Sequence, residues 1–410
     1  MKFSTAVVFA AAAFSVVVAP PPPSKPAPKF PMVRLAKRFE LPGDGKTKLP
    51  DLDRARAAVH LGLDLHLGIK RDGKTSSTLA TNAATIYTAS VGVGSPATEY
   101  NLIIDTGSAN TWIGAGQPYQ QTSTSRDTGE TVQVAYGSGF FSGEEYIDQV
   151  TIADNLVIDK QSIGVADKSA GIYNADGILG IGPAILTTGS TPSHREIPTV
   201  TDNLAASGAI SNNAVGIFFA PTTEADTTGV LTWGGADPAY YTSKPRYVPV
   251  TRTRPASAYW GIDQSIMYHN QTLMPLSAGI VDTGSTLLLL ATDIFKAYKS
   301  ATGGQEDAAT GLLKITNEQY AGLSNLDFVI GDNTFSLTPN AQIWPRYLNT
   351  ALGGDANAIY LIAADMGAPS GRGMDFINGY TFLERFYTIY DTTNSRVGFA
   401  ETEYTYSEAN

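Results

Sequence analysis

The sequence predicts a mostly β protein made of two similar lobes with a cleft between them. Short runs rich in Val, Ile, Tyr and Thr alternate with clusters of Gly, Asn, Asp and Ser along most of the 410 residues, as in chains of short strands and turns. The tetrapeptide Asp-Thr-Gly-Ser occurs at residues 105–108 and again at 282–285, each time after two aliphatic residues. The length suffices for two or three domains of ordinary size. The repeat therefore indicates two lobes, each with a carboxylate on a glycine turn at a strand end.

The chain opens with the features of a secretory signal at residues 1–19. Lys2 precedes an apolar run over Ala6–Ala19, and the charge, the length and the small-residue ending are typical of a cleaved signal peptide. The run is too short to span a bilayer comfortably, so we expect a secreted, extracellular protein with no membrane segment. A buried helix is the alternative. The sequence has no cysteine, which excludes disulfides, thiol catalysis and zinc–thiolate sites.

Residues 20–75 form a basic segment ahead of an acidic remainder. The first 75 residues carry 13 lysines and arginines against 6 acidic residues, whereas the rest carries 15 against 32. The segment starts proline-rich and extended and continues with helical tendencies. Opposite charges in one secreted chain favour a basic pro-segment over an acidic body, with Lys70 or Lys74 near the paired aspartates and cleavage near Lys74–Ser77. The alternative is a solvated linker with scattered charge.

From Ser76 onward the pattern predicts strands and turns, with a boundary near Pro245–Thr251 and hence lobes at 76–248 and 249–410. Composition and periodicity predict strand-rich segments in the first half at residues 86–94, 99–105, 131–139, 150–158, 172–182 and 216–235. The second half repeats this arrangement with segments at 258–263, 278–290, 328–337 and 374–391. Helices are expected at 199–208 and 292–303.

Asp105 and Asp282, the aspartates of the two repeats, are the candidate catalytic residues. Two carboxylates a few ångströms apart cannot both ionise easily, so one pKa rises, the other falls and the pair shares a proton. The ionised partner would activate a water as general base while the protonated partner polarises a carbonyl group. In each repeat glycine permits the tight turn, serine would donate to the carboxylate, and threonine would interlock across the lobes. These supporting residues are Thr106, Gly107, Ser108, Thr283, Gly284 and Ser285.

Over about residues 76–400 the chain resembles the pepsin family of aspartic proteases. The repeats carry the resemblance, together with the segments Ala109–Trp112, Tyr136–Gly139 and Ala175–Gly180. The resemblance implies a bilobal fold, catalysis by the two aspartates, and a flap hairpin whose tyrosine hydrogen-bonds a tryptophan. It also implies that the Ala175–Gly180 element packs behind the first catalytic loop. The residues that it places around a substrate are Trp112, Tyr136, Gly137, Ser138, Ile178 and Thr286.

Within that family, the absence of cysteine and the segments 340–346 and 382–387 resemble the polyporopepsin type of secreted fungal enzymes. Two positions depart from the family pattern. Asn378 replaces an aliphatic residue in the second lobe, so its buried amide must find partners. Ser138 replaces the aspartate that lets some fungal members accept lysine on the acyl side of the cut bond. We therefore expect hydrophobic or aromatic residues there.

The resemblance implies an acid endopeptidase acting on protein or peptide substrates, inhibited by pepstatin-type compounds and by its own pro-segment, and monomeric. No cofactor or metal is expected, because the four histidines are scattered without ligand spacing. Basic residues are sparse after residue 75, which argues against nucleic-acid binding. The segment Gly92–Ala97 fits a loose dinucleotide fingerprint but precedes a strand rather than a helix. Asn270 begins an N-glycosylation acceptor.

Two other function classes compete with a protease. A non-catalytic binder could use the same fold, although such relatives usually lose an aspartate or its glycine turn, and both are present here. A glycosidase also works with two carboxylates, but it needs them in unlike environments, whereas the two motifs are identical. Digestion of denatured protein at acidic pH, with and without pepstatin, separates the three.

Overall fold

The computed structural model describes residues 30–39, 47–63, 85–137, 139–221 and 228–410. The expected signal peptide, Lys70, Lys74 and Ser138 lie outside these residues. The described residues form a mostly β molecule, as the sequence predicts. No described helix is both long and apolar enough to cross a membrane.

The largest sheet runs through the middle of the molecule and joins segments from both halves of the chain. Its order is β11-β23-β22-β9-β10-β1-β2-β3-β8-β4-β7-β6-β5, so the last strands of the chain lie beside first-half strands. The strands are β1 (Met32–Phe39), β2 (Thr85–Val93), β3 (Thr98–Asp105), β4 (Thr111–Ile113), β5 (Arg126–Ala135), β6 (Phe140–Ala153), β7 (Leu156–Ala170), β8 (Gly177–Gly180), β9 (Ala214–Phe218), β10 (Thr228–Trp233), β11 (Arg246–Pro249), β22 (Phe386–Asp391) and β23 (Arg396–Glu401).

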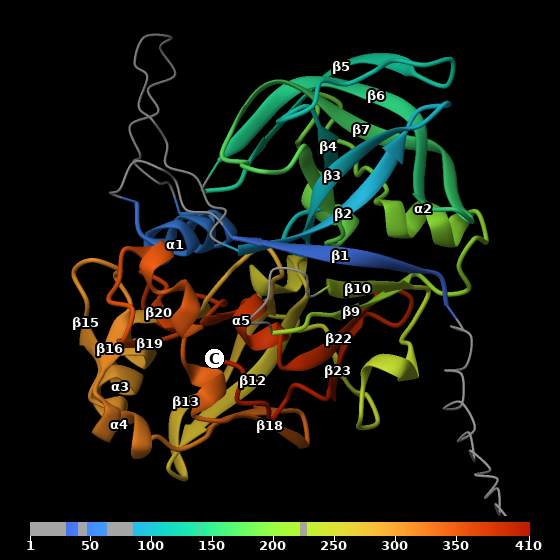
Figure 1. Cartoon of the computed structure of the whole chain (residues 1–410). Coiled ribbons are helices and arrows are strands. Elements are labelled where there is room, and N and C mark those ends of the chain that lie inside the picture. The colour runs from blue at the N-terminus through green and yellow to red at the C-terminus, as the bar shows by residue number, and fades with distance from the viewer. Residues whose placement is uncertain (1–29, 40–46, 64–84, 138, 222–227) are drawn as a thin grey trace, which may run out of the picture.

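The second half builds its own sheet, in the order β18-β17-β12-β13-β21-β14-β20, beside a small sheet β15-β16-β19. The strands are β12 (Gly261–Tyr268), β13 (Gln271–Val281), β14 (Leu288–Leu290), β15 (Gln305–Glu306), β16 (Leu313–Ile315), β17 (Leu326–Ile330), β18 (Asn333–Leu337), β19 (Ile359–Leu361), β20 (Ala363–Asp365) and β21 (Phe376–Asn378). Figure 1 shows this lobe on one side of β1 and the β5–β7 layer on the other.

Few helices accompany the sheets. The α-helices are α1 (Leu49–His60), α2 (Val200–Ala206), α3 (Thr292–Thr302), α4 (Asn317–Ala321) and α5 (Tyr380–Leu383). The 3₁₀ turns are η1 (Ala184–Thr187), η2 (Pro238–Tyr240), η3 (Ala256–Ala258), η4 (Asn340–Gln342), η5 (Arg346–Leu348) and η6 (Thr350–Leu352). Helix α1 begins with Pro50 in its first turn, where the missing N–H is not needed, and Asp51 suits the positive end of the helix.

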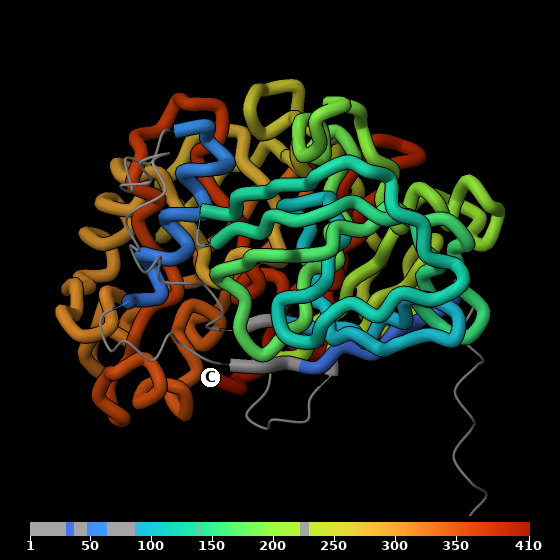
Figure 2. Tube along the Cα trace, turned by 90° about the horizontal axis from the view of Figure 1, so that it is seen from above, coloured from blue at the N-terminus to red at the C-terminus, as the bar shows by residue number. Residues whose placement is uncertain are grey.

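Two N-terminal elements lie at the centre of the molecule. Strand β1 is hydrogen-bonded between β10 and β2, so it fills the middle of the largest sheet. Helix α1 packs beside β20 of the second lobe and lies between the two lobes in Figures 1 and 2. Two elements of the basic segment 20–75 therefore belong to the folded molecule: β1 is a strand of the largest sheet, and α1 lies between the lobes.

Candidate active site

The two Asp-Thr-Gly-Ser repeats fold into nearly identical loops. In the first, the Gly107 N–H donates to Asp105 Oδ1 at 2.9 Å and Ser108 Oγ donates to Asp105 Oδ2 at 2.6 Å. In the second, Gly284 and Ser285 make the corresponding bonds to Asp282 at 2.9 and 2.6 Å. Each carboxylate is thus fixed by donors two and three residues after it. Both aspartates are almost fully buried.

The two loops are locked together by their threonines. The N–H of Thr106 donates to Thr283 Oγ1 and the N–H of Thr283 donates to Thr106 Oγ1, both at 3.0 Å. Each hydroxyl in turn donates to a carbonyl oxygen of the opposite lobe, Val281 at 3.1 Å and Ile104 at 2.9 Å. This reciprocal arrangement brings residues 177 positions apart into one site.

The first loop is backed by apolar side chains. Asp105 ends β3, which pairs in parallel with β8, so that Ile103 lies opposite Ile178. Ile178 packs in a buried cluster with Trp112 and Tyr136. The Ala175–Gly180 element therefore supports the first loop, and Ile178 itself belongs to the core beneath the hairpin.

The second loop is backed by a buried amide pair. Asn378 on β21 lies opposite Val281 on β13, and its carbonyl accepts the Asp282 N–H at 3.1 Å. Its side-chain amide donates to Gln264 Oε1 at 2.9 Å, and Gln264 Nε2 donates back to Asn378 Oδ1 at 3.3 Å. Both side chains are fully buried. From the sequence we expected the buried amide of Asn378 to need a partner but did not identify one. That partner is Gln264 on β12.

The β5–β6 hairpin covers the site from the first lobe. Tyr136 N–H donates to the Gly139 carbonyl at 2.8 Å, and Gly137 turns with a φ of 70°. The ring of Tyr136 lies roughly parallel to that of Trp112, 6.4 Å between centroids. A side chain at Gly137 would overlap the Ala55 carbonyl of α1, so this helix contacts the hairpin tip. Figure 2 shows α1 (blue) beside the end of the hairpin.

Arg56 of α1 joins the two carboxylates. Its Nε donates to Asp282 Oδ2 at 2.7 Å, and one Nη reaches both Asp105 Oδ1 at 2.5 Å and Asp282 Oδ1 at 3.1 Å. The guanidinium is buried with them. Among the described residues the cation in this position is Arg56, whereas Lys70 and Lys74, which we expected near the aspartates from the sequence, lie outside the described residues.

Two further residues of α1 contact the second loop. The Asp53 carboxylate accepts the Thr286 N–H at 3.1 Å and the Leu287 N–H at 2.7 Å. His60 Nε2 lies 3.5 Å from Asp282 Oδ2, and its ring packs edge-on against Tyr259. Sequence reasoning did not identify Asp53, Arg56 or His60. The available signal was their helical spacing, which puts all three on one face of α1.

For Asp282 and Arg56, the neighbouring charges and burial shift the pKa in opposite directions. Burial alone would raise the pKa of Asp282, but the positive charge of Arg56, with His60 beside it, holds that pKa well below its ordinary value. Burial would likewise lower the pKa of Arg56, but Asp105 and Asp282 raise it, so the guanidinium stays charged. For Asp53 burial prevails and raises the pKa to about 7, although the N–H groups of Leu287 and Thr286 favour the charged form.

Asn270 lies away from these loops, at the exposed turn between β12 and β13. His269 and Asn270 both have positive φ, 49° and 58°, as in a two-residue hairpin turn. Among the described residues no group of three or more His, Cys, Asp or Glu side chains could hold a metal ion.

The fold and site define a bilobal protein with one carboxylate from each half at a shared cleft. The chain belongs to the eukaryotic aspartyl protease family, whose sequence profile matches residues 86–402. It is 55% identical to polyporopepsin from Irpex lacteus over 335 residues, 81% of this chain and 98% of that protein. It is 28% identical to pepsin A from Sus scrofa over 336 residues, 77% and 81% of the two chains. The crystal structure of the aspartic proteinase from Irpex lacteus superposes with a TM-score of 0.77 at 54% identity, covering 79% of this chain and 96% of that one.

The expected membership of the pepsin family is therefore confirmed, and the chain is an aspartic-type endopeptidase. Its substrates are accordingly peptides. The family also excludes the glycosidase alternative.

Proposed function

We propose that the chain is the precursor of a secreted endopeptidase that cuts peptide bonds at acidic pH, with Asp105 and Asp282 as its catalytic residues. The observation that carries the proposal is the joining of both carboxylates, on equal glycine turns, by the single cation Arg56. Without that cation, two buried carboxylates this close share a proton. Their serine and glycine donors hold them ready in the same orientation.

In the reaction, the ionised aspartate takes a proton from a water, whose oxygen attacks the carbonyl carbon of the peptide bond. The protonated aspartate hydrogen-bonds the carbonyl oxygen as negative charge develops there. The C–N bond then breaks as its nitrogen takes up the proton that the first aspartate removed from the water, which restores the starting protonation of the pair. No cofactor enters, because acid and base are the same pair in two protonation states.

Residues 20–75 act as the pro-segment, behind a signal peptide at 1–19 and ahead of catalytic lobes at 76–248 and 249–410. Three contacts of α1 support this assignment: Arg56 occupies both carboxylates, Asp53 occupies the Thr286 and Leu287 N–H groups, and the helix fills the space under Gly137. A substrate and α1 cannot both be there. Acid weakens the ion pairs by protonating carboxylates, which frees the cleft for cleavage of the segment.

The remaining parts of the proposal concern partners. The apolar cluster of Trp112, Tyr136 and Ile178 under the hairpin supports a preference for hydrophobic residues around the cut bond. Ser138, which the family resemblance assigns to this region, lacks the charge that would attract lysine there. Pepstatin-type inhibitors bind the freed pair of aspartates, and the enzyme works as a monomer. Asn270 is glycosylated, which its exposed turn allows.

The test is digestion of denatured haemoglobin or casein after brief acid treatment of the purified precursor. We expect proteolysis that pepstatin blocks and that Asp105→Ala and Asp282→Ala each reduce to background, with folding kept by circular dichroism. Asp332→Asn removes a carboxylate from an exposed turn and should digest normally. Substantial activity in either dyad variant would contradict the catalytic assignment. No digestion by the native chain would favour a non-catalytic binder.

A further inference from the structure

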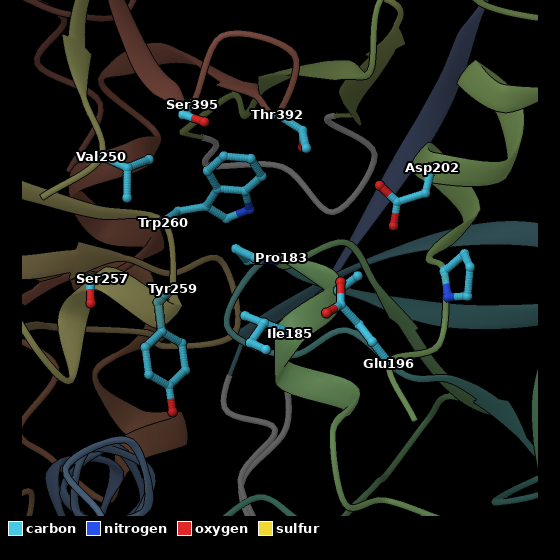
Figure 3. Close-up of a pocket in the computed structure, with 12 residues that line it drawn as sticks. Pro183, Ile185, Glu196, Asp202, Val250, Ser257, Tyr259, Trp260, Thr392 and Ser395 are labelled. Carbon is cyan, nitrogen blue, oxygen red and sulfur yellow. The ribbon is translucent and has the colours of Figure 1, made fainter. Parts of the chain in front are cut away.

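A cavity lies between residues of the first lobe and residues of the second lobe, and Tyr259 is among the residues that line it. It has a volume of about 420 Å³. One wall comes from the first lobe, through Pro183, Ile185, Glu196 and Asp202, and the other from the β11–β12 connection, through Tyr259 and its neighbours. Figure 3 shows these two sets of side chains on opposite sides of the space.

Tyr259 connects this cavity with the catalytic cleft. It lines the cavity, and its ring packs against His60, whose Nε2 lies 3.5 Å from Asp282. In Figure 3 its hydroxyl end points toward the blue helix α1. Burial raises the pKa of Tyr259 to about 12, and the charges of Arg56, Asp282 and Asp105 also act on it. A peptide that replaces α1 in the cleft would therefore pass Tyr259 and enter the cavity.

The walls combine apolar surface with negative charge. Pro183, Tyr259 and Trp260 give flat apolar surfaces, and Ile185 lies 49% exposed at the rim. Glu196 and Asp202 are the charged residues in the lining, and none of the lining residues is a lysine, arginine or histidine. Such a surface suits a long side chain with an apolar stem and a cationic end.

Glu196 is the carboxylate available to that cation. Asp202 is already engaged, because it accepts from the Thr199 N–H at 2.8 Å and from Asn213 Nδ2 at 2.7 Å. Glu196 is exposed, and no ion pair joins it to a described lysine or arginine. Its neighbour Arg195 pairs with Glu145 at 2.8 Å and does not line this cavity.

We propose that this cavity is a subsite for a lysine or arginine of the peptide substrate, beyond the residues next to the cut bond, with Glu196 as its specificity-determining residue. This proposal rests on the proposed protease function. The stem of the basic residue lies on Tyr259, Trp260 and Ile185, and its charge pairs with Glu196. The requirement differs from that at the cut bond itself, where hydrophobic residues are preferred.

The test uses the activated enzyme and a peptide series with one fixed cleavable hydrophobic pair. A single lysine, norleucine or glutamate is moved through each position on both sides of the pair, and kcat/KM is measured. We expect lysine to exceed norleucine about two- to fivefold, the range of a partly exposed ion pair, at a position on one side only. Glu196→Gln should remove this preference and Glu196→Lys should transfer it to glutamate.

Glu318→Gln, the same change on α4 of the other lobe, is the matched control and should keep the lysine preference. The proposal is overturned if no position prefers lysine, or if the preference survives in Glu196→Gln. A preference for norleucine at that position, equal in all variants, would mean an apolar pocket and also overturns it. Cleavage of no peptide at all would overturn the protease function and this subsite together. Cleavage without the Glu196 effect removes the subsite alone.

Discussion

The two catalytic loops have the same sequence and the same internal bonds, but they lie in unlike surroundings. The four distances from glycine and serine to the carboxylates agree between the loops, 2.9 and 2.6 Å in each. Behind the first loop lie apolar residues, with Leu179 in the position before the glycine. Behind the second, the same position is Asn378.

The fronts of the loops differ as well. The first loop faces the hairpin with Tyr136, whereas α1 places Asp53 and His60 against the second. Arg56 likewise makes two hydrogen bonds to Asp282 and one to Asp105. The four residues of each Asp-Thr-Gly-Ser motif thus determine the local geometry of its carboxylate. The protonation of that carboxylate depends on neighbours from distant segments. Equal motifs do not make equivalent aspartates.

The largest expected effect comes from removing the group that the two loops share. Arg56→Gln leaves two buried carboxylates facing each other without a cation, and breaking a buried ion pair in this way costs about 3–5 kcal/mol. We expect the precursor to lose most of its hold on α1 and to process itself at a pH where the native precursor stays intact. Gel analysis of processing against time measures this.

Arg54→Gln is the matched control for that change, because it removes the same charge two residues earlier, from a different face of α1. Arg54 is partly exposed, pairs with Asp51 at 2.9 Å and donates to the Asp365 carbonyl, so its loss should alter processing only slightly. Equal processing of Arg56→Gln and the native precursor would show that α1 is held without the shared cation.

A smaller effect is expected from making the second loop's support resemble the first. Asn378→Leu or Gln264→Leu alone leaves the other amide buried without its partner, which costs about 1–3 kcal/mol. The double substitution removes both polar groups and should recover most of that loss, giving a coupling of about 1–3 kcal/mol in a double-mutant cycle. Urea unfolding of the four proteins measures the cycle.

Additive losses would mean that the amide pair contributes nothing beyond its two side chains. Leu179→Asn in the first lobe provides the reverse control, because it introduces a buried amide at a position that holds an apolar side chain. This substitution should lower the free energy of unfolding, and Gln264 cannot compensate for it because Gln264 belongs to the other lobe.

The sequence predicted the features whose partners lie within the repeats. Glycine and serine bond a carboxylate two or three residues away, and the threonine lock joins the two copies, so both follow from the motif itself. The partners of Asn378 and of the dyad could not be found this way. Gln264 is 114 residues from Asn378, and Arg56 is 226 residues from Asp282. Only the tertiary fold brings them together.

The cation between the two aspartates was not identified from the sequence. From the sequence we expected Lys70 or Lys74 of the basic pro-segment near the aspartates, and both lie outside the described residues. The occupant of the site, Arg56, lies in a stretch whose helical character was predicted. The positions 53, 56 and 60 share a face in any helix. A planar cation with several fixed donors is also better suited than lysine to two carboxylates at once.

The smallest expected effect comes from Asp53, one of the α1 residues that make the surroundings of the two loops differ. Its pKa is about 7 with α1 in place and 3.8 in its ordinary state, so the docked helix binds an extra proton between these values. Docking through Asp53 is therefore fully favoured below pH 3.8 and is lost as the pH rises through about 7. This is opposite in sign to Asp282, whose lowered pKa makes docking weaken as the pH falls.

We therefore expect the thermal midpoint of the precursor, relative to Asp53→Asn, to rise as the pH is lowered from neutral to mildly acidic. The gain is at most about 1.4 kcal/mol for each pH unit, because the neutral amide has no proton to bind. Asp51→Asn, on the exposed side of α1, should show a constant offset over the same range. A constant offset for Asp53→Asn too would mean that Asp53 does not titrate there. A rising difference would mean that Asp53 keeps α1 docked until acid neutralises the aspartates themselves, so that release depends on the dyad alone.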